Sequence, residues 1–267
     1  MTGEPESGGE FVRSLQRGLA VIRAFDADHQ GMTLTEVAGR AGLTRAAARR
    51  FLLTLVELRY VSFHDGRYWL LPRVLELGYA YLSSLSLGEV ARLHLESFVA
   101  EVNESSSISV LDDLDIVYVV RAPVRRVISI GLSVGSRLPA YATSMGRVLL
   151  AGLDDADLEE RLARLEITPL TPWTVRDVDA LRSIILEVRE QGYALVEEEF
   201  EEGLRSVAVP LRDASGTVIA AVNTSVHSSR GTVETLRRDV LPLLLDTVQA
   251  IEVDLRSKGG VGTFIHG

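Results

Sequence analysis

The pentapeptide at 131–135, Gly-Leu-Ser-Val-Gly, matches the G-x-S-x-G pattern that holds the nucleophilic serine of many hydrolases. Such a serine sits on a sharp turn that leads directly into a helix, and an acidic residue and a histidine follow it in the chain. His227 does follow Ser133, but Pro139 prevents a clean helix start after the motif, and no hydrolase-like alternation of strands and helices surrounds it. We therefore interpret the pentapeptide as a glycine-punctuated loop with no catalytic residue, and a serine hydrolase with an accessory interaction domain stays an alternative.

Metal and thiol chemistry have little support in the sequence. The acidic run at 197–202 lacks the spacing of a Ca²⁺ loop and is typical of a solvated face or a strand-end loop. The five histidines are scattered, and the absence of cysteine excludes disulfides, thiolate metal sites and cysteine nucleophiles. We predict neither a metal site nor a cofactor.

Polar residues interrupt two apolar strand patterns between 203 and 226, at Ser206, Asn223, Thr224 and Ser225. Hydroxyl and amide groups inside otherwise apolar strands are the donors that the pocket of a small anionic ligand would use. Polar residues that satisfy one another at a sheet edge would give the same pattern. The sequence leaves both interpretations open.

Arginine is concentrated in the first third of the chain. The formal net charge is −9, but Arg13–Arg73 holds 10 Arg against 5 Asp and Glu, whereas residues 86–267 hold 18 Lys and Arg against 28 Asp and Glu. A basic block attached to an acidic body suits a DNA-reading module that is joined to another domain.

Two short helices are predicted to position these arginines. Thr33 and Glu36 form a T-x-x-E capping box that starts the first helix, and Gly42 follows its end. Thr44 caps the second helix, in which apolar residues recur at i, i+3, i+4 and i+7 and define a buried side. The residues of that side are Ala48, Phe51, Leu52 and Leu55.

The opposite side of the second helix presents Ala46, Arg49 and Arg50, with Arg45 on the flank. Small residues near the helix N-terminus and long planar donors beyond it suit insertion into a DNA major groove about 12 Å wide. This arrangement predicts a recognition helix.

A hairpin is predicted after the recognition helix. Residues 60–63 and 67–71 alternate apolar and polar across His64-Asp65-Gly66, a turn signal that indicates a wing with Arg67 near its tip. Wing arginines commonly reach phosphate or the minor groove. A small packed domain with arginines on its solvated face would show a similar pattern. The predicted DNA-binding residues are Thr33, Thr44, Arg45, Ala46, Arg49, Arg50 and Arg67.

The length of 267 residues and the 46% hydrophobic composition indicate two domains. We expect a disordered tail at 1–10, a winged helix-turn-helix at 11–71, a linker helix at 72–87, an effector-binding domain at 88–258 and a flexible tail at 259–267. No apolar run is long enough to cross a bilayer and the acidic N-terminus does not resemble a signal peptide, so we expect a cytoplasmic protein.

Two further helices flank the predicted DNA-binding module. Ser14 is the predicted N-cap of a supporting helix, whose buried stripe would be Leu15, Leu19, Ile22 and Phe25. Pro72 begins the linker helix, which is apolar on more than one face and is therefore a predicted dimer contact.

The second domain has the pattern of an α+β fold. Helices are predicted at 87–102, at 143 or 144 to 150, and at 155–165, 176–191 and 232–256. Strands are predicted at 107–111, 116–121, 127–130, 193–196, 205–212 and 218–226, with a loop at 131–140. Six short strands flanked by helices indicate an antiparallel sheet in a sensor domain.

Four stretches carry a family resemblance: SLQRGLAVIRAFD at 14–26, AGLTRAAARRFLLTL at 41–55, LPAYATSMGRVLLA at 138–151 and GYALVEEEFEEGLRSVAVPLRDASGTVIAAVN at 192–223. Together they resemble IclR-type transcription regulators over about residues 11–258. The resemblance implies an N-terminal winged helix-turn-helix, a linker helix and a C-terminal GAF-like effector domain, assembled as a dimer or a dimer of dimers. The first and third stretches look most like the branch that controls aromatic-acid breakdown through protocatechuate and β-ketoadipate.

The resemblance also implies a small-molecule site between the sheet and the helix start near Thr143. Carried over by position, the glyoxylate- and pyruvate-binding pattern of the family includes the backbone amides of Ser144 and Met145, which can bind a carboxylate at a helix start. An acidic member of that pattern is replaced by Val196, which argues against these oxoacids and fits a larger or more apolar carboxylate. The expected effector-binding residues are Leu132, Leu138, Thr143, Ser144, Met145, Gly146, Ser206, Asn223 and Ser225.

The predicted function is that of a ligand-responsive, sequence-specific DNA-binding transcription regulator with a protocatechuate- or β-ketoadipate-like effector. Its expected partners are double-stranded operator DNA, the small carboxylate effector and further copies of the same chain, without a membrane. Besides the hydrolase, an architectural DNA-binding protein without a ligand is the alternative, and it predicts no discrete pocket.

Overall fold

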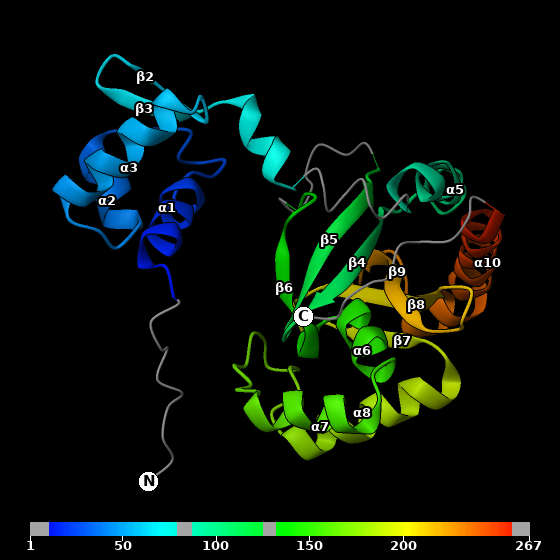
Figure 1. Ribbon diagram of the computed structural model, residues 1–267. Helices are drawn as coiled ribbons and strands as arrows, with labels where there is room; N and C mark the ends of the chain where they lie inside the picture. The colour runs from blue at the N-terminus through cyan, green and yellow to red at the C-terminus, as the bar shows by residue number, and fades with distance from the viewer. Residues whose placement is uncertain (1–10, 79–86, 125–131, 258–267) are drawn as a thin grey trace, which may run out of the picture. The chain divides into compact units, whose positions relative to one another are not determined.

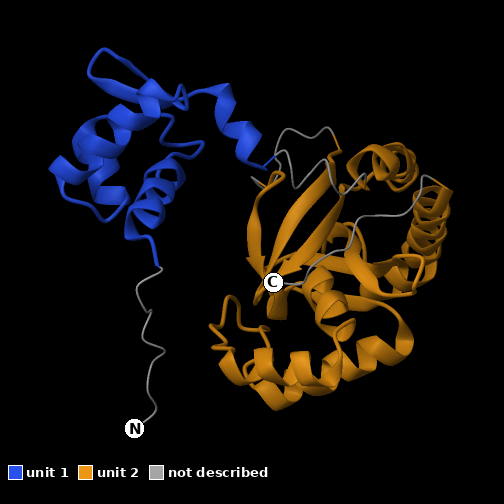
Figure 2. Ribbon diagram, viewed as in Figure 1, with its two compact units in different colours: residues 1–81 blue, residues 82–267 orange. Residues whose placement is uncertain are grey.

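The computed structural model describes residues 11–78, 87–124 and 132–257, and the chain divides into two compact units, 1–81 and 82–267 (Figure 2). The predicted tails at 1–10 and 259–267 and the predicted strand at 127–130 lie outside the described residues. Within the described ranges, no helix is long and apolar enough to cross a membrane.

The first unit combines helices with a small antiparallel sheet (Figure 1). Its helices are α1 (Arg13–Arg23), α2 (Leu34–Arg40) and α3 (Arg45–Glu57), and its strands are β1 (Gly31–Met32), β2 (Val61–His64) and β3 (Arg67–Leu70), in the order β1-β3-β2. The core consists of Val21, Ala24, Phe25, Met32, Val37, Leu52, Leu55, Val61 and Tyr68. The predicted helix-turn-helix and hairpin are confirmed, and β1, too short to leave an alternating pattern, was not predicted.

The prediction for α1 is wrong at its start. Ser14 lies inside the helix, whose N-cap is Val12, and no side chain caps it. Leu15 and Leu19 are 63% and 47% exposed, so the first half of the predicted apolar stripe is not buried, whereas Ile22 and Phe25 pack in or against the core as predicted. Only the last turn and the residues just after it reach the core, through Val21, Ala24 and Phe25.

The predicted linker begins at Pro72, as expected, but its first turn is the 3-10 helix η1 (Pro72–Leu75). Residues 76–78 continue in helical conformation, and the remainder of the predicted linker up to residue 86 lies outside the described residues.

The second unit is built on a six-stranded antiparallel sheet (Figure 1). Its strands are β4 (Ser106–Asp112), β5 (Asp115–Ala122), β6 (Arg137–Pro139), β7 (Ala194–Glu197), β8 (Leu204–Arg212) and β9 (Val218–His227), in the order β6-β5-β4-β9-β8-β7. Ser107 pairs with Asn223, and Ser206 pairs with Ser225. The register therefore brings polar positions from three strands together.

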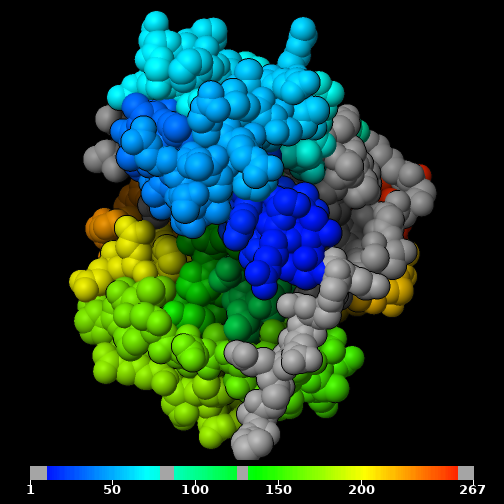
Figure 3. Space-filling view, turned by 60° about the vertical axis from the view of Figure 1, so that its left-hand side comes forward, coloured from blue at the N-terminus to red at the C-terminus, as the bar shows by residue number. Residues whose placement is uncertain are grey.

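Helices cover both faces of this sheet (Figure 1). One face packs against α5 (Leu87–Val102) and α10 (Leu241–Ser257), and the other against η2 (Ala140–Ala142), α6 (Ser144–Ala151), α7 (Asp155–Arg164) and α8 (Val178–Gln191). Side chains alternate between the two cores: Val207 and Val209 face α5 and α10, whereas Ala208 faces α6. The side chains of α7 and α8 also cover a broad part of the outer surface of this unit (Figure 3).

Two segments of this unit differ from the sequence-based expectation. The loop expected at 131–140 contains β6, which pairs with β5 and completes the sheet. It is a three-residue edge strand that ends at Pro139, so its sequence carries no strand pattern. The closing helix predicted at 232–256 is helical from Val233 to Ser257, but it changes type near its start: α9 (Val233–Thr235) continues through the π-helical segment η3 (Leu236–Val240) into α10.

Gly146 explains why α6 can pack directly on the preceding 3-10 turn. A Cβ atom at this position would lie 2.1 Å from the carbonyl oxygen of Ala140, which is backbone and cannot rotate away. We expect Gly146→Ala to destabilise the second unit by about 1–3 kcal/mol because the helix must shift. Chemical denaturation of Gly146→Ala beside Gly88→Ala, where a Cβ meets only ordinary contacts, measures this. Equal stability of the two variants would contradict the prediction.

Candidate functional site

The first candidate surface is the exposed face of α3. The Thr44 side chain caps the helix by accepting a hydrogen bond from the Ala47 N–H at 3.3 Å. Ala48 and Leu52 are fully buried against the core, and this orientation leaves the opposite side of the helix in solvent. Arg45, Ala46, Arg49 and Arg50 are all exposed there, as predicted from the spacing.

The three guanidinium groups of this face have no anionic partner within the described part of the chain. Arg45, Arg49 and Arg50 form no side-chain hydrogen bond or ion pair with any described residue, whereas Arg40 is paired with Asp26 at 2.5 Å. The positive charge on α3 is therefore available to an external anion, and this is the property of a recognition helix.

Two of the other predicted DNA-binding residues have structural roles. Thr33 completes the capping box of α2: its hydroxyl accepts from the Glu36 N–H, and its own N–H donates to the Glu36 carboxylate at 2.7 Å. Arg67 lies beside the Asp65-Gly66 turn, where both residues have positive φ, and its Nη1 donates to the Gly31 carbonyl at 2.8 Å. It therefore ties β3 to β1, and remains half exposed.

The second candidate site is a cavity of about 310 Å³ in the second unit. It lies where the ends of β8 and β9 meet the start of α6 and the loop between β7 and β8. Eight of the nine predicted effector-binding residues line it: Leu132, Leu138, Thr143, Ser144, Met145, Ser206, Asn223 and Ser225. The ninth, Gly146, does not; its N–H donates to the Thr143 hydroxyl at 3.1 Å.

The polar strand residues do not lie at a sheet edge. β9 is between β4 and β8, and β8 is between β9 and β7, so the edge interpretation is wrong. Asn223 donates from Nδ2 to the Ser225 hydroxyl at 3.3 Å, and both side chains line the cavity. The residues are thus partly satisfied by each other and still face the space that a ligand would occupy.

Arg121 is a lining residue that the sequence reasoning missed. It lies on β5 directly opposite Ser107, and its Nη1 donates to the Ser107 hydroxyl at 3.2 Å. It makes no ion pair with a described residue, whereas Arg230, which also lines the cavity, is paired with Glu104 at 3.2 Å. A partly buried guanidinium with donors to spare is a strong anchor for a carboxylate. The sequence feature that could have identified Arg121 is an arginine within an otherwise apolar strand.

Two hydroxyl groups add to this chemistry. The Ser144 Oγ is buried and has no hydrogen-bond partner among the described residues, although Ser144 is the first residue of α6 and lines the cavity. An unsatisfied buried hydroxyl is costly unless a ligand or water uses it. Burial raises the pKa of Tyr118 to about 12, partly offset by the positive charge of Arg121. The Tyr118 phenol in the cavity wall therefore stays protonated and can donate a hydrogen bond at neutral pH.

Three of the five glutamates in the acidic run at 197–202 make side-chain contacts within the chain, and the other two, Glu201 and Glu202, line the cavity. Glu197 pairs with Arg205 at 2.6 Å, the Glu198 carboxylate accepts from the Gly203 N–H, and Glu199 pairs with Arg147 at 2.6 Å. Among the described residues, no group of three or more His, Cys, Asp or Glu side chains is arranged to hold a metal ion.

The serine of the G-x-S-x-G match lies on an exposed turn. The Ser133 hydroxyl is 3.5 Å from the Ser136 hydroxyl, and no described histidine or carboxylate contacts it. His227 instead has Nδ1 2.8 Å from the Ser229 hydroxyl. The turn is followed by β6 rather than by a helix, so the geometry of a nucleophilic serine is not met.

Comparison with known proteins agrees with this division of the chain. The family described as bacterial transcriptional regulator IclR C-terminal matches residues 79–253, and the IclR helix-turn-helix domain matches residues 14–65. The chain belongs to the IclR family. It is therefore a DNA-binding transcription regulator and not an enzyme, and the α+β fold with a six-stranded effector domain is confirmed.

Three relatives within the IclR family are informative. The Pca regulon regulatory protein of Pseudomonas putida is 46% identical over 91% of this chain and 83% of its own length. The p-hydroxybenzoate hydroxylase transcriptional activator of Acinetobacter baylyi is 38% identical over 91% of both chains. A crystal structure of an IclR homolog from Microbacterium hydrocarbonoxydans, complexed with 4-hydroxybenzoate, matches with a TM-score of 0.81 at 28% identity over 91% of this chain and 99% of that one. The predicted likeness to regulators of aromatic-acid breakdown is confirmed.

Proposed function

We propose that this IclR regulator binds a monocyclic aromatic acid of the 4-hydroxybenzoate and protocatechuate class and controls genes for aromatic-acid breakdown in the cytoplasm. Its similarity to a Pca regulon regulatory protein and to a homolog complexed with 4-hydroxybenzoate supports the ligand class. The observation that carries the proposal is Arg121, a cation in the cavity wall without a carboxylate partner among the described residues.

The cavity wall matches both parts of such a molecule. Arg121 and the unsatisfied Ser144 hydroxyl supply donors for a carboxylate or a phenolic oxygen. The apolar part of the lining, which suits an aromatic ring, consists of Leu132, Leu138, Met145, Val196 and Phe200. A volume of about 310 Å³ is at the lower end of small-molecule sites and suits a single ring.

The same lining disfavours glyoxylate and pyruvate. Val196 is 3% exposed and faces the cavity at the position where the oxoacid-binding pattern has an acidic residue. A two- or three-carbon oxoacid would leave the apolar wall in contact with water, so the favourable free energy of burying that wall would not be gained.

On the DNA side, α3 enters the major groove in this proposal, with Arg49 and Arg50 on base edges or phosphates and Arg45, Ala46 and Thr44 at the helix start. Thr33 and Arg67 support the geometry of α2 and the wing and contact the backbone. A dimer, or a dimer of dimers, would present two such helices to half-sites about one helical turn apart. The domain boundaries expected from the sequence keep these two activities in separate parts of the chain.

Calorimetric titration of the full-length protein tests the ligand class. We expect saturable binding of 4-hydroxybenzoate or protocatechuate, and weaker or no binding of β-ketoadipate, glyoxylate and pyruvate. If the protein binds glyoxylate or pyruvate but neither aromatic acid, its ligand belongs to another chemical class and the proposed class is wrong. Absence of binding by all five acids would also contradict the proposal.

Ser144→Ala isolates the contribution of the unsatisfied hydroxyl. We expect aromatic-acid affinity to fall about 3- to 10-fold, the loss of one hydrogen bond, while the ligand-free protein is as stable as the wild type or slightly more so, because an unsatisfied buried group is removed. Calorimetry and thermal denaturation measure the two effects. A loss of ligand-free stability without a change in affinity would show that Ser144 serves the fold only.

A further inference from the structure

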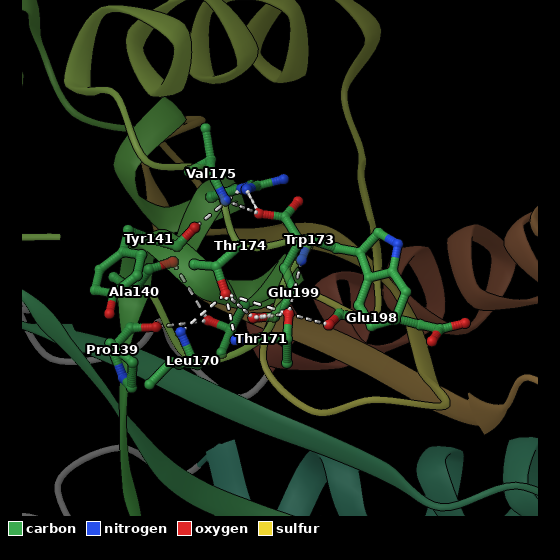
Figure 4. Close-up of polar contacts among 12 residues, drawn as sticks. Pro139, Ala140, Tyr141, Leu170, Thr171, Trp173, Thr174, Val175, Glu198 and Glu199 are labelled. Atoms are coloured by element: carbon green, nitrogen blue, oxygen red, sulfur yellow. Dashed lines mark hydrogen bonds and ion pairs between the residues drawn. The ribbon is translucent and has the colours of Figure 1, made fainter. Parts of the chain in front are cut away.

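A network of hydrogen bonds lies behind the cavity and joins two of its walls. One wall is the start of α6, where Ser144 and Met145 line the cavity, and the other is the β7–β8 loop, which contributes residues 200–203. The connection between α7 and α8 contacts both walls without lining the cavity (Figure 4). These three segments are far apart in the sequence.

The centre of the network is an ion pair between Arg147 and Glu199. Arg147 lies three residues after Ser144 on α6, and its side chain is only 3% exposed. Its Nη2 donates to Glu199 Oε2 at 2.6 Å, and its Nε donates to the Tyr141 carbonyl at 3.1 Å. Neither Arg147 nor Glu199 lines the cavity, although residues close to each of them in sequence do. The pair therefore joins the two walls without lining the ligand space.

The α7–α8 connection braces the same loop. The Thr171 hydroxyl donates to the Glu198 carbonyl at 2.7 Å, and the Thr174 hydroxyl donates to the Glu199 carbonyl at 2.7 Å (Figure 4). The Val175 N–H donates to the Glu199 carboxylate at 3.0 Å, so this carboxylate accepts from two segments at once. Thr171 and Thr174 are 8% and 3% exposed, and water therefore cannot easily replace these bonds.

The other side of the connection is attached to the α6 wall. The Tyr141 hydroxyl donates to the Thr168 carbonyl at 2.8 Å, while the Tyr141 carbonyl accepts from Arg147. The chain of contacts thus runs from η2 and α6 through the connection to the β7–β8 loop and returns through the ion pair. It is a closed ring of polar contacts that joins the two cavity walls.

The β7–β8 loop has an internal reason to need this support. Glu198 has φ +57°, a left-handed conformation that is uncommon for a residue other than glycine. Its N–H donates to the Leu204 carbonyl at 2.7 Å, and its carboxylate accepts from the Gly203 N–H at 3.0 Å. Strained backbone of this kind persists only where the surrounding structure holds it.

We propose that Arg147, Glu199, Thr171 and Thr174 form a clamp that sets the separation of the two cavity walls, so that they are positioning residues for the effector. The identity of the ligand rests on the proposed function, whereas the geometry of the clamp does not. These four residues do not contact the ligand, yet they determine how tightly it binds. Their substitution would make the β7–β8 loop, one of the two cavity walls, more mobile.

The test is the double variant Arg147→Met/Glu199→Gln. Removing one partner alone would strand a buried charge, whereas removing both charges is commonly tolerated. The Glu199→Gln substitution keeps a side-chain oxygen that accepts from the Val175 N–H, so the brace from the α7–α8 connection is preserved. The matched control is Arg182→Met/Glu159→Gln, which removes a bidentate pair between α7 and α8, at 2.7 and 2.8 Å, that does not line the cavity.

For the double variant we expect a melting temperature within about 4 °C of the wild type. We expect 4-hydroxybenzoate to bind about tenfold more weakly, mainly through faster dissociation. The Glu198, Gly203 and Leu204 amides should exchange hydrogen at least about tenfold faster in the ligand-free protein. The control should match the wild type in affinity and in exchange of these amides. Wild-type affinity, dissociation rate and exchange in the double variant would overturn the clamp.

The outcomes separate the clamp from the ligand assignment. If the wild type binds none of the aromatic acids, the proposed ligand class fails, and the exchange rates of the loop amides still decide for or against the clamp. If the double variant does not fold, Thr171→Val removes one brace to the Glu198 carbonyl. It should weaken binding about threefold and speed exchange of the same amides, and unchanged values would overturn the inference.

Discussion

Replacing Arg49 and Arg50 together with alanine is expected to reduce operator affinity at least about a hundredfold while the fold persists. Both side chains are exposed on α3 and form no hydrogen bond or ion pair with a described residue, so their removal should leave the fold intact. Each guanidinium that reaches a guanine edge contributes about 1–3 kcal/mol of discrimination, so two such losses remove most of the specific binding.

Fluorescence anisotropy on a DNA fragment selected by the wild-type protein from a random pool measures this effect at fixed salt concentration. The matched control is Arg17→Ala/Arg23→Ala, which removes the same charge from the exposed side of α1. The control should weaken selected and unrelated DNA equally, because it changes only the general attraction to phosphate. An α3 variant that keeps its preference for the selected fragment would show that these arginines do not read sequence.

Arg121→Met is expected to weaken aromatic-acid binding by about 30-fold or more, because a desolvated carboxylate would lose its charged partner. The ligand-free protein should keep its stability to within about 1 kcal/mol, since the guanidinium forms only one hydrogen bond to a described residue. The aromatic-acid affinity of Arg121→Lys should lie between those of the wild type and Arg121→Met, because lysine keeps the charge and loses the planar pair of donors.

The control for this prediction is Arg230→Met. Arg230 also lines the cavity, but its guanidinium is paired with Glu104, so we expect a much smaller change in affinity. Calorimetry of the variants with 4-hydroxybenzoate and protocatechuate checks the predicted order of their affinities. Equal losses in Arg121→Met and Arg230→Met would indicate a general effect of positive charge, and unchanged affinity in Arg121→Met would remove Arg121 from the site.

Local signals account for the parts of the fold that sequence reasoning predicted well. The capping box at Thr33 and Glu36, the cap at Thr44 and the positive φ of Gly42 and Gly66 each depend on a few adjacent residues, and all are present in the structure. Such signals act before tertiary packing and can therefore be recognised in a single sequence.

Features that depend on distant packing were missed. The leucines at 15 and 19 form a helical stripe, but whether the core reaches them depends on where α1 meets α3. Similarly, β6 is a strand because β5 offers an edge to pair with, and its own residues, Arg-Leu-Pro, carry no strand preference.

The candidate site shows the same distinction. Ser206, Asn223 and Ser225 stood out because polar residues interrupt apolar strands, and the structure places all three at the cavity. Arg121 is as anomalous in its strand, yet its place in the wall of the same cavity, opposite Ser107, follows only from the register of β4 and β5. Arg147 and Glu199 are 52 residues apart in the sequence, and no local pattern predicts that they pair.

The two units give the protein a place to bind DNA and a place to bind a ligand, and regulation requires that the two be coupled. A ligand shifts operator affinity only if it binds one arrangement of the protein more tightly than another, and the coupling is typically about 1–3 kcal/mol. That range corresponds to a change of about 5- to 150-fold in operator affinity.

The most direct test is therefore the operator affinity of the full-length protein with and without saturating 4-hydroxybenzoate or protocatechuate, measured for the wild type and for Arg121→Met. We expect one of the acids to change the wild-type operator Kd at least about fivefold, in either direction, and to leave the Kd of Arg121→Met unchanged at the same concentration. Wild-type operator affinity that stays the same at saturating concentrations of both acids would contradict the account.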